Sequence, residues 1–359
     1  MIAIITINDY KNIGNRLQNY AMFKILSSFD ETYNLIRYLD CEHKKEEEIK
    51  KEEGRVWFRN IVKFFIPGKN HYSALRHFAF VRFNKLIKNG ETLSAETDYS
   101  QLNSRYDYFV TGSDQVWNPS FKGNGMYINM LAFTSSQKKI AGCPSISIDT
   151  ISLEQEKEFC NYLSDYKYLS CREKAGSEYI SKITGNTCIT LIDPTLVLSQ
   201  DEWDEISKKP IVPLPDQYIM VYFLGNLTDE YNSRIQLLAQ DKKLHIVNVN
   251  DKNSKYYGIG PAEFIYMIKR CNAIVTDSYH GTIFSLIYNK PVRVFKRVDE
   301  TRMMNSRFDS LVQMLDVEMG IFNSDTMDLD ENTRAKYSVE KLAKEKAAFI
   351  NYFNSVFAN

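Results

Sequence analysis

Residues 272–295, NAIVTDSYHGTIFSLIYNKPVRVF, decide the fold class of this chain. The stretch opens with a short apolar run, 273–275, which suits a strand buried on both faces. Ser278 follows at the position of a helix N-cap, and we expect a helix over residues 279–288. Lys290-Pro291 ends that helix, and residues 292–295 are typical of another strand. The stretch therefore predicts a strand–helix–strand unit of a parallel sheet.

One imidazole, that of His280, falls in the first turn of the predicted helix. Gly281 beside it would let a ligand approach the backbone closely. Free N–H groups and the positive end of the helix favour an anion at this place, which is the carboxyl edge of a strand. Two interpretations remain: an imidazole that contacts a ligand, or a buried histidine satisfied by its neighbours.

Strands and helices alternate on both sides of residues 208–215, a linker with three prolines. Strands are expected at 2–7, 33–39, 106–111, 139–148, 168–171, 189–192, 218–224 and 245–249. Helices are expected at 16–29, 200–206, 229–240, from 260 onward, at 302–315 and at 338–357. This pattern predicts an α/β protein with two doubly wound, Rossmann-like domains facing a central cleft, over 1–207 and 216–337. We expect the helix within 338–359 to pack across the junction of the two domains.

A helical insertion is expected at about 42–90. Residues 42–55, EHKKEEEIKKEEGR, are almost wholly charged, which is typical of a solvated helix face or loop. Residues 56–90 instead alternate aromatic with basic side chains. This second part either touches an anionic lipid surface or a lipid-linked substrate, or forms an ordinary helical hairpin whose Lys and Arg stems lie along apolar surface.

The bulk composition excludes several classes of protein. The 359 residues carry 45 basic and 45 acidic side chains, so the basic surplus of a nucleic-acid-binding protein is missing. The six cysteines lie far apart without a CxxC pair, and the five histidines are scattered, so neither a metal site nor a disulfide framework is expected. The N-terminus is typical of a strand rather than a signal peptide, and no apolar window is long enough to span a bilayer. We expect a soluble cytoplasmic protein, with contact at the inner face of the membrane left open.

Polar residues follow other predicted strands as well. Asp114 and Gln115 can hydrogen-bond sugar hydroxyls, while Trp117 either offers a flat apolar face or packs beneath its loop. Arg172 carries a fork of donors suited to a carboxylate or a phosphate, unless it pairs with a nearby glutamate. Cys171 has no base supplied by the sequence, so we assign it to the core.

Six motifs occur in order over about residues 1–315: 12–15 (NIGN) with 18–20 (QNY), 112–117 (GSDQVW), 171–174 (CREK), 193–195 (DPT), 276–282 (TDSYHGT) and 305–307 (NSR). On these motifs the chain resembles the polysaccharide pyruvyl transferase family. Tyr279 stands where phenylalanine is commoner, and residues 141–145, AGCPS, replace a more usual Tyr-Ala-Ala-Ser-like strand.

The resemblance implies a two-domain fold similar to GT-B glycosyltransferases and a role in surface polysaccharide biosynthesis. It further implies transfer of a pyruvyl group from phosphoenolpyruvate to two hydroxyls of a sugar, which yields a ketal and phosphate. The family's donor contacts match Arg172 and His280. We expect Arg172 to hold the donor carboxylate and His280 to carry the proton and to contact phosphate. Phosphoenolpyruvate is then a co-substrate, and no cofactor or metal is expected.

The remaining predicted contacts divide between donor and acceptor. Donor contacts are expected from Ser278, Tyr279, Gly281, Thr282, Lys296, Arg297 and Arg307, and acceptor contacts from Gly14, Asn15, Ser113, Asp114, Gln115 and Trp117. The acceptor sugar can be carried by a nucleotide, by a lipid or by a glycan. The alternatives are a GT-B glycosyltransferase that uses a nucleotide sugar, and a non-catalytic sugar- or partner-binding protein on the same scaffold.

Overall fold

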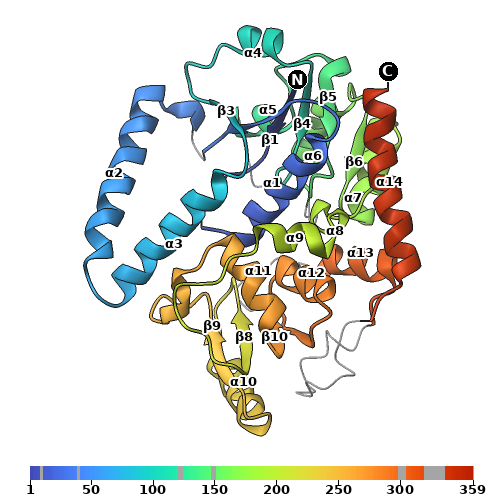
Figure 1. Cartoon of the computed structure of the whole chain (residues 1–359). Helices are drawn as coiled ribbons and strands as arrows, with labels where there is room; N and C mark the ends of the chain where they lie inside the picture. The colour runs from blue at the N-terminus through green and yellow to red at the C-terminus, as the bar shows by residue number, and fades with distance from the viewer. Residues whose placement is uncertain are drawn as a thin grey trace.

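The computed structural model describes residues 1–8, 11–38, 41–119, 124–146, 151–297, 305–318 and 336–358. These residues build two α/β units, each with a parallel sheet flanked by helices, one above the other in Figure 1. The fold class predicted from the sequence is confirmed.

The sheet of the N-terminal unit has the strand order β3-β2-β1-β4-β5, with every neighbouring pair parallel. A bridge between Ile140 and Tyr168 continues it into the parallel pair β6 and β7. Because β1 pairs with β2 on one side and β4 on the other, the winding reverses between β1 and β4, where ligands bind in such sheets. The strands are β1 (Ile2–Ile5), β2 (Thr32–Ile36), β3 (Asn89–Thr92), β4 (Tyr108–Thr111), β5 (Lys139–Ala141), β6 (Leu169–Cys171) and β7 (Cys188–Thr190).

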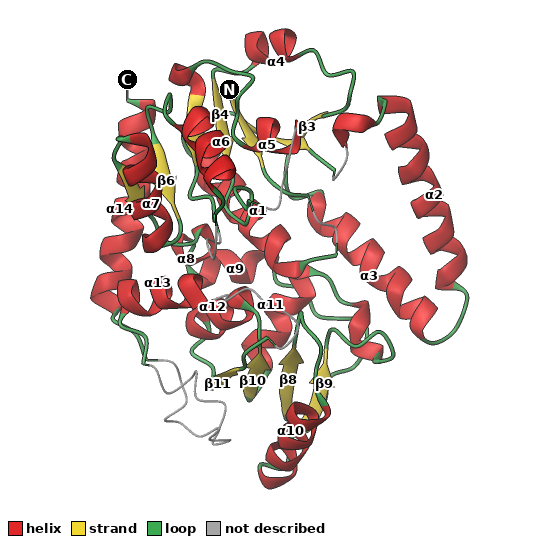
Figure 2. Ribbon diagram, turned by 180° about the vertical axis from the view of Figure 1, so that it is seen from behind, coloured by secondary structure: helices red, strands yellow, loops and turns green. Residues whose placement is uncertain are grey.

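The sheet of the C-terminal unit has the order β11-β10-β8-β9, again parallel throughout. Its winding reverses between β8 and β10, and the arrows of both strands point toward the N-terminal unit in Figure 2. The carboxyl ends of these strands therefore lie near the junction of the two units. The strands are β8 (Tyr218–Tyr222), β9 (His245–Asn248), β10 (Ala273–Thr276) and β11 (Val292–Val294).

Helices connect the strands and cover the sheets. In the N-terminal unit they are α1 (Ile13–Leu26), α2 (Glu46–Phe64), α3 (Lys69–Asn84), α4 (Tyr99–Arg105), α5 (Asn124–Asn129), α6 (Leu153–Leu163), α7 (Lys174–Thr184), α8 (Pro194–Val197) and α9 (Gln200–Ile206). Beyond it lie α10 (Asp229–Asp241), the short 3₁₀ helix η3 (Lys255–Gly258), α11 (Pro261–Arg270), α12 (Tyr279–Ile287), α13 (Asn305–Leu315) and α14 (Val339–Phe357). None of the described helices is long and apolar enough to cross a bilayer.

A continuous apolar core joins the two units through α1. The ring of Tyr20 on α1 lies 5.8 Å from that of Trp203, and Trp203 lies 4.9 Å from Phe284 on α12. α1 also contacts α11 directly. Helix α1 is thus held against the C-terminal unit by packing.

Helix α3 provides a second connection between the units. At Gly260, which precedes α11, an added Cβ would lie 2.8 Å from the Cβ of Ala79, so the backbones of the two elements touch. Arg82 of α3 forms an ion pair with Glu263 of α11. Arg76 of α3 donates to the carbonyls of Lys11 and Tyr257, one in each unit.

The C-terminal helix α14 lies along the N-terminal unit in Figure 1 and contacts α13. The hydroxyl of Tyr352 donates to the carbonyl of Ala141 at the end of β5, at 2.8 Å. Phe353 packs on Phe29, which follows α1, with ring centroids 6.2 Å apart.

The strand expected over 139–148 is shorter than predicted. β5 ends at Ala141 because Cys143 adopts a left-handed conformation with φ of 61°. A Cβ at Gly142 would meet the carbonyl oxygen of Thr111 at 2.6 Å, so the backbone after β5 lies close against the end of β4. Residues 147–148 lie outside the described residues.

Candidate active site

The first turn of α12 carries the imidazole around which the site is built. Strand β10 is fully buried, and Ser278 after it caps α12, its side chain accepting from the N–H of Gly281 at 3.3 Å. The N–H of Ser278 donates to the hydroxyl of Thr276 at 3.0 Å. These local bonds fix the turn that presents His280, as the sequence predicted for the cap and the helix.

The imidazole of His280 rests on the N-terminal end of α1, in the other unit. A Cβ added at Gly14 would lie 2.3 Å from Nδ1 of His280, so no larger residue fits at position 14 without displacing the ring. The acceptor contact predicted for Gly14 stays a prediction, and the structure shows this glycine against the ring of His280. At Gly281 an added Cβ would meet the Thr276 hydroxyl at 2.6 Å, so this glycine serves packing of the helix on its own strand. The ligand approach expected at Gly281 stays a prediction.

A buried carboxylate, that of Asp193, joins His280 to Arg172. Asp193 is the N-cap of α8, and its Oδ1 accepts from the N–H of Thr195 at 2.9 Å. Its Oδ2 accepts from Nη1 of Arg172 at 2.8 Å and lies 3.4 Å from Nε2 of His280. Burial alone would raise the pKa of Asp193, but His280 and Arg172 lower it below its usual range. Asp193 therefore stays ionised at neutral pH and forms a buried ion pair with Arg172.

Two arginines flank the ring of Tyr279. The guanidinium of Arg172 lies 5.0 Å from the ring centroid, and that of Arg307, from α13, lies 5.7 Å from it. Both arginines are buried. Burial and the charge of Arg172 together lower the pKa of Arg307. Two cations this close in a buried site favour binding of an anion between or beside them.

Arg172 also keeps unused hydrogen-bonding capacity. Its Nη2 is buried and has no hydrogen-bond partner among the described residues, and Nε lies 3.9 Å from Glu173. The alternative of a simple pair with a nearby glutamate is thus replaced by a primary pair with Asp193. A small cavity of about 10 Å³, room for about one water, adjoins this side chain. It is lined by Arg172, Ile192, Asp193, Leu196, Tyr279, Ser310, Leu311 and Met314.

The loop after β4 meets α1 beside these groups. Nδ2 of Asn15 donates to Oδ2 of Asp114 at 2.5 Å, and the N–H of Gln115 donates to Oδ1 at 2.9 Å. Asp114 has φ of 95°, a strained backbone conformation of the kind that clusters at functional sites. Ser113, predicted as an acceptor contact, faces Arg172, since its hydroxyl lies 3.5 Å from Nη1 of that side chain.

Trp117 lies in the core rather than on a cleft wall. Its side chain is fully buried, its Nε1 donates to the carbonyl of Asn129 at 3.3 Å, and its ring packs edge-on to Tyr166. The predicted contact of this ring with a sugar was wrong, because no face of the indole is exposed. The loop carries Trp117 inward beneath Asp114.

Among the described residues, three others predicted to contact the donor take no part in the contacts of Asp193 set out above. Arg297 donates from Nε to Oδ2 of Asp277 at 3.0 Å, at the end of β10, and Lys296 is exposed. The hydroxyl of Thr282 donates to the carbonyl of Ser278 at 3.1 Å within α12.

Cys171 is buried, and burial raises the pKa of its thiol, in keeping with its assignment to the core.

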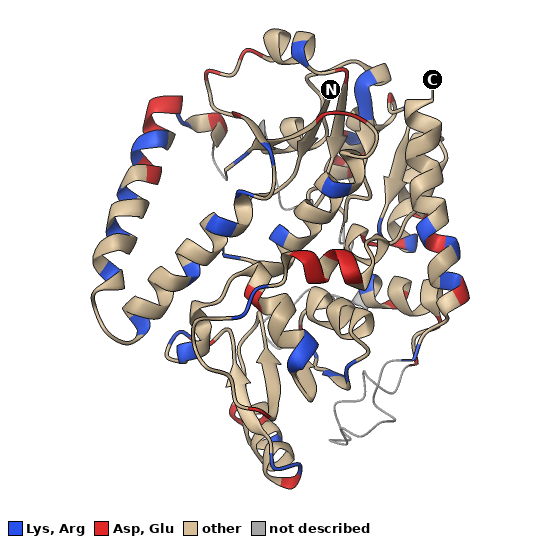
Figure 3. Ribbon diagram, viewed as in Figure 1, with Lys and Arg blue, Asp and Glu red and all other residues tan. Residues whose placement is uncertain are grey.

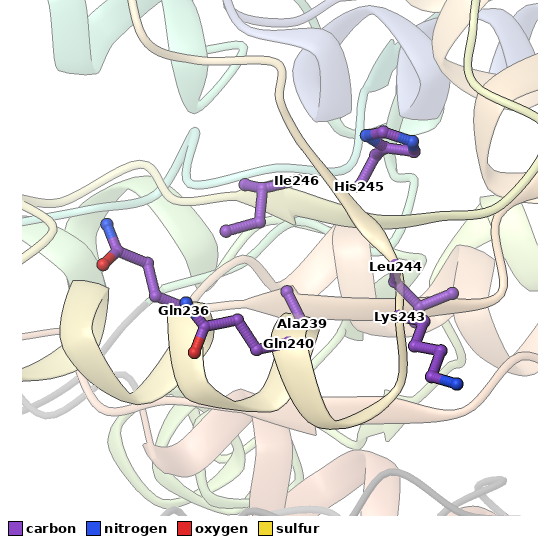
Figure 4. Close-up of a pocket in the computed structure, with 7 residues that line it drawn as sticks. All are labelled: Gln236, Ala239, Gln240, Lys243, Leu244, His245 and Ile246. Carbon is purple, nitrogen blue, oxygen red and sulfur yellow. The ribbon is translucent and has the colours of Figure 1, made fainter.

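A larger hollow, of about 430 Å³, lies between α10 and β9 at the far edge of the C-terminal sheet (Figure 4). Its lining contains none of the residues around Asp193. Among the described residues, no group of three or more His, Cys, Asp or Glu side chains is arranged to hold a metal ion.

Comparison with solved structures shows the fold. UDP-N-acetylglucosamine 2-epimerase from Rickettsia bellii has 10% sequence identity and a TM-score of 0.51, with 100% of this chain and 97% of that chain covered. A putative UDP-N-acetylglucosamine 2-epimerase from Listeria monocytogenes has 11% identity and a TM-score of 0.50, over 99% of this chain and 97% of that chain. Both support a GT-B-like arrangement of two Rossmann-like units. No match was found among curated proteins.

The family assignment rests on the length of chain that a family model covers. The model described as polysaccharide pyruvyl transferase matches residues 12–299, which contain Gly14, Arg172, Asp193 and His280. The chain therefore belongs to the polysaccharide pyruvyl transferase family.

Proposed function

We propose that this protein transfers a pyruvyl group from phosphoenolpyruvate to two hydroxyls of a sugar, forming a ketal and releasing phosphate. One observation carries the proposal beyond the family assignment. A proton carrier, His280, and an anion-binding guanidinium, Arg172, share one carboxylate oxygen of Asp193. Phosphoenolpyruvate requires these two functions side by side, because it is a small dianion or trianion that must be protonated on carbon.

The cations around Tyr279 suit the donor. Arg172 offers the unpartnered Nη2, and Arg307 lies on the other side of the same ring. A carboxylate or phosphate placed here accepts charge-assisted hydrogen bonds and offsets the repulsion between the arginines. The positive end of α12 adds to this attraction. Because the adjoining cavity holds about one water, side chains that close it must move to admit the donor.

The proposed reaction balances with one proton added to carbon and one delivered to the leaving group. His280, as imidazolium, donates a proton to the methylene carbon, which becomes the methyl group of the ketal. A sugar hydroxyl attacks the neighbouring carbon, and a second hydroxyl then displaces phosphate. The two protons lost by the hydroxyls restore His280 and protonate phosphate. Asp193 stabilises the imidazolium while leaving its own charge unchanged.

We propose the acceptor site at the loop after β4. Asn15 and Asp114 are joined there at the end of α1, next to the Arg172 side chain reached by Ser113. A sugar that exchanges hydrogen bonds with these groups would place its hydroxyls beside the donor. The strained conformation of Asp114 supports a functional role for this loop.

Titration with phosphoenolpyruvate tests the donor site without knowledge of the acceptor. A ligand that binds the folded state raises the melting temperature by mass action, so thermal unfolding and calorimetry report its affinity. We expect phosphoenolpyruvate to stabilise the wild type and Arg172→Gln to lose most of this effect. His280→Asn should lower turnover by about 10²–10⁴. Arg270→Gln and His245→Asn are matched controls, since both side chains are exposed in the C-terminal unit.

A panel of nucleotide sugars completes the titration. Stabilisation by phosphoenolpyruvate that survives in both controls but not in Arg172→Gln supports the donor site. No stabilisation by phosphoenolpyruvate, together with turnover of a nucleotide sugar alone, would contradict the proposal and favour a glycosyltransferase.

A further inference from the structure

The C-terminal half of α2 and the turn after it expose an unusual number of large apolar side chains. Phe58, Ile61, Val62 and Phe65 are spaced i, i+3, i+4 and i+7, so they form one stripe along the helix. Phe58 is 68% exposed and Phe65 is 77% exposed. A stripe with this spacing normally faces a core, and contiguous exposed apolar surface marks an interaction site.

The opposite side of α2 is the one that packs against the protein. At about 100° per residue, Asn60 lies roughly opposite the stripe, and it is buried. Trp57 packs edge-on against Phe78 of α3, at 5.2 Å. α2 and α3 form a hairpin that projects from the side of the molecule in Figure 1. The stripe therefore faces away from the rest of the described chain.

The charge of this region is strongly one-sided. Between positions 54 and 90 the sequence holds no acidic residue and eight basic ones: Arg55, Arg59, Lys63, Lys69, Arg76, Arg82, Lys85 and Lys88. Arg55 and Arg59 are exposed beside the stripe, and Lys69 is exposed at the start of α3. The first half of α2 has the opposite sign of charge, with five glutamates and two lysines over residues 46–53. Figure 3 shows this change from acidic at the start of α2 to basic toward the turn.

We propose that residues 55–69, called here the hairpin end, bind the surface of an anionic phospholipid bilayer. An amphipathic helix with aromatic and aliphatic side chains on one face and Arg and Lys beside them binds in the plane of such a surface. Each cation near the surface adds attraction to the anionic headgroups. The glutamates of the first half of α2 are repelled, so the hairpin end docks while the start of α2 stays in water.

A second copy of this chain fits the same surface less well. If two stripes packed against each other, Arg55 and Arg59 of both copies would approach with like charge. If two α2 helices instead paired antiparallel to match charges, Phe58 and Phe65 would lie against the glutamate-rich half of the other copy. An anionic bilayer surface satisfies the stripe and its cations together.

Co-sedimentation of the full-length protein with vesicles tests this proposal. Vesicles of phosphatidylcholine alone are compared with vesicles of phosphatidylcholine mixed with phosphatidylglycerol. We expect preferential binding to the mixed vesicles that weakens as salt is added, because surface charges are screened. Arg55→Gln with Arg59→Gln should lower the partition coefficient about 25-fold, about fivefold for each cation. The matched control, Lys50→Gln with Lys51→Gln, removes the same charge from the acidic half and should change binding less than about twofold.

A second pair of variants separates the apolar contribution. Phe58→Ser with Phe65→Ser should abolish binding while leaving the melting temperature unchanged, since both side chains are exposed. The proposal is overturned if the wild type fails to bind the mixed vesicles. It is also overturned if the double arginine variant and the double phenylalanine variant both bind as the wild type does. A dimer of the wild type in sedimentation without lipid, lost in the Phe58→Ser, Phe65→Ser variant, would assign the stripe to a second copy of this chain. Such a dimer, together with no binding of the wild type to vesicles, also overturns the proposal. None of these outcomes depends on the pyruvyl transfer reaction.

Discussion

Substitution of Gly14 by alanine tests whether the two units build one catalytic site. The new Cβ would lie 2.3 Å from Nδ1 of His280, 2.7 Å from its Cγ and 2.9 Å from its Cβ. Because the contact reaches the root of the side chain, rotation of the ring cannot relieve it, and the imidazole must move away from Oδ2 of Asp193, now 3.4 Å distant. Overpacking of this kind costs about 1–3 kcal/mol of stability. Misplacing the proton carrier should cost about 10²–10⁴ in turnover.

Two measurements are made on the same samples. Phosphate release is followed with an acceptor that supports turnover, and stability is measured by urea unfolding. Gly54→Ala is the matched control, since Gly54 lies within α2 with no atom near its added Cβ. That control should be stabilised by about 0.5–1 kcal/mol and keep full activity. Because Gly14→Ala acts through His280, adding it to His280→Asn should lower turnover little further. Wild-type turnover in Gly14→Ala would refute the reasoning, as would full additivity of the two losses.

Three other predictions concern the charged groups of the site and its need for metal. Asp193→Asn should cost about 3–5 kcal/mol at neutral pH, because it leaves Arg172 buried without its main partner. Since the folded pKa of Asp193 is lowered, its stabilisation is present above its usual pKa of about 3.9 and is lost as pH falls below that value. The difference in the free energy of unfolding between wild type and Asp193→Asn, measured with urea, should therefore become smaller in acid. A difference that stays constant with pH would contradict the ionised pair. Arg307→Gln should weaken phosphoenolpyruvate binding about tenfold or more by calorimetry, the equivalent of a lost charged hydrogen bond, and unchanged affinity would remove Arg307 from the donor site. Turnover should be unaffected by a chelator such as EDTA, and its loss with recovery on adding a divalent metal would contradict metal-independent catalysis.

The sequence was most informative where structure is encoded locally. The predicted strand, cap and helix at 273–288 correspond to β10 and α12, because the apolar run, Ser278 and Lys290-Pro291 each act on neighbouring residues. β3 was not predicted, because Asn89–Thr92 contains no apolar residue to signal a strand. It forms at the edge of the sheet through pairing with β2, which is a tertiary effect.

Long-range contacts account for what the sequence did not show about the site. Asp193 was recognised as part of a motif, but its bond to Arg172 and its approach to His280 join residues far apart in the chain. In the same way, Gly281 was chosen because it neighbours His280 in sequence, whereas Gly14 is the glycine whose missing side chain admits the ring. The available signal for Asp193 was a strand followed by Asp-Pro. That signal indicates the N-cap of a helix, but it does not indicate which residues contact the second carboxylate oxygen, Oδ2.

The position of the site between the units gives the other interface contacts a functional meaning. His280 packs on the end of α1, and the core around Trp203 and the contacts of α3 hold the two units together around it. Gly260 allows α3 to touch the C-terminal unit at backbone distance, and Arg76 bonds to both units at once. A shift of one unit against the other would move His280 relative to Asp193. Within the insertion between β2 and β3, α3 therefore helps to hold the two units together at the candidate site.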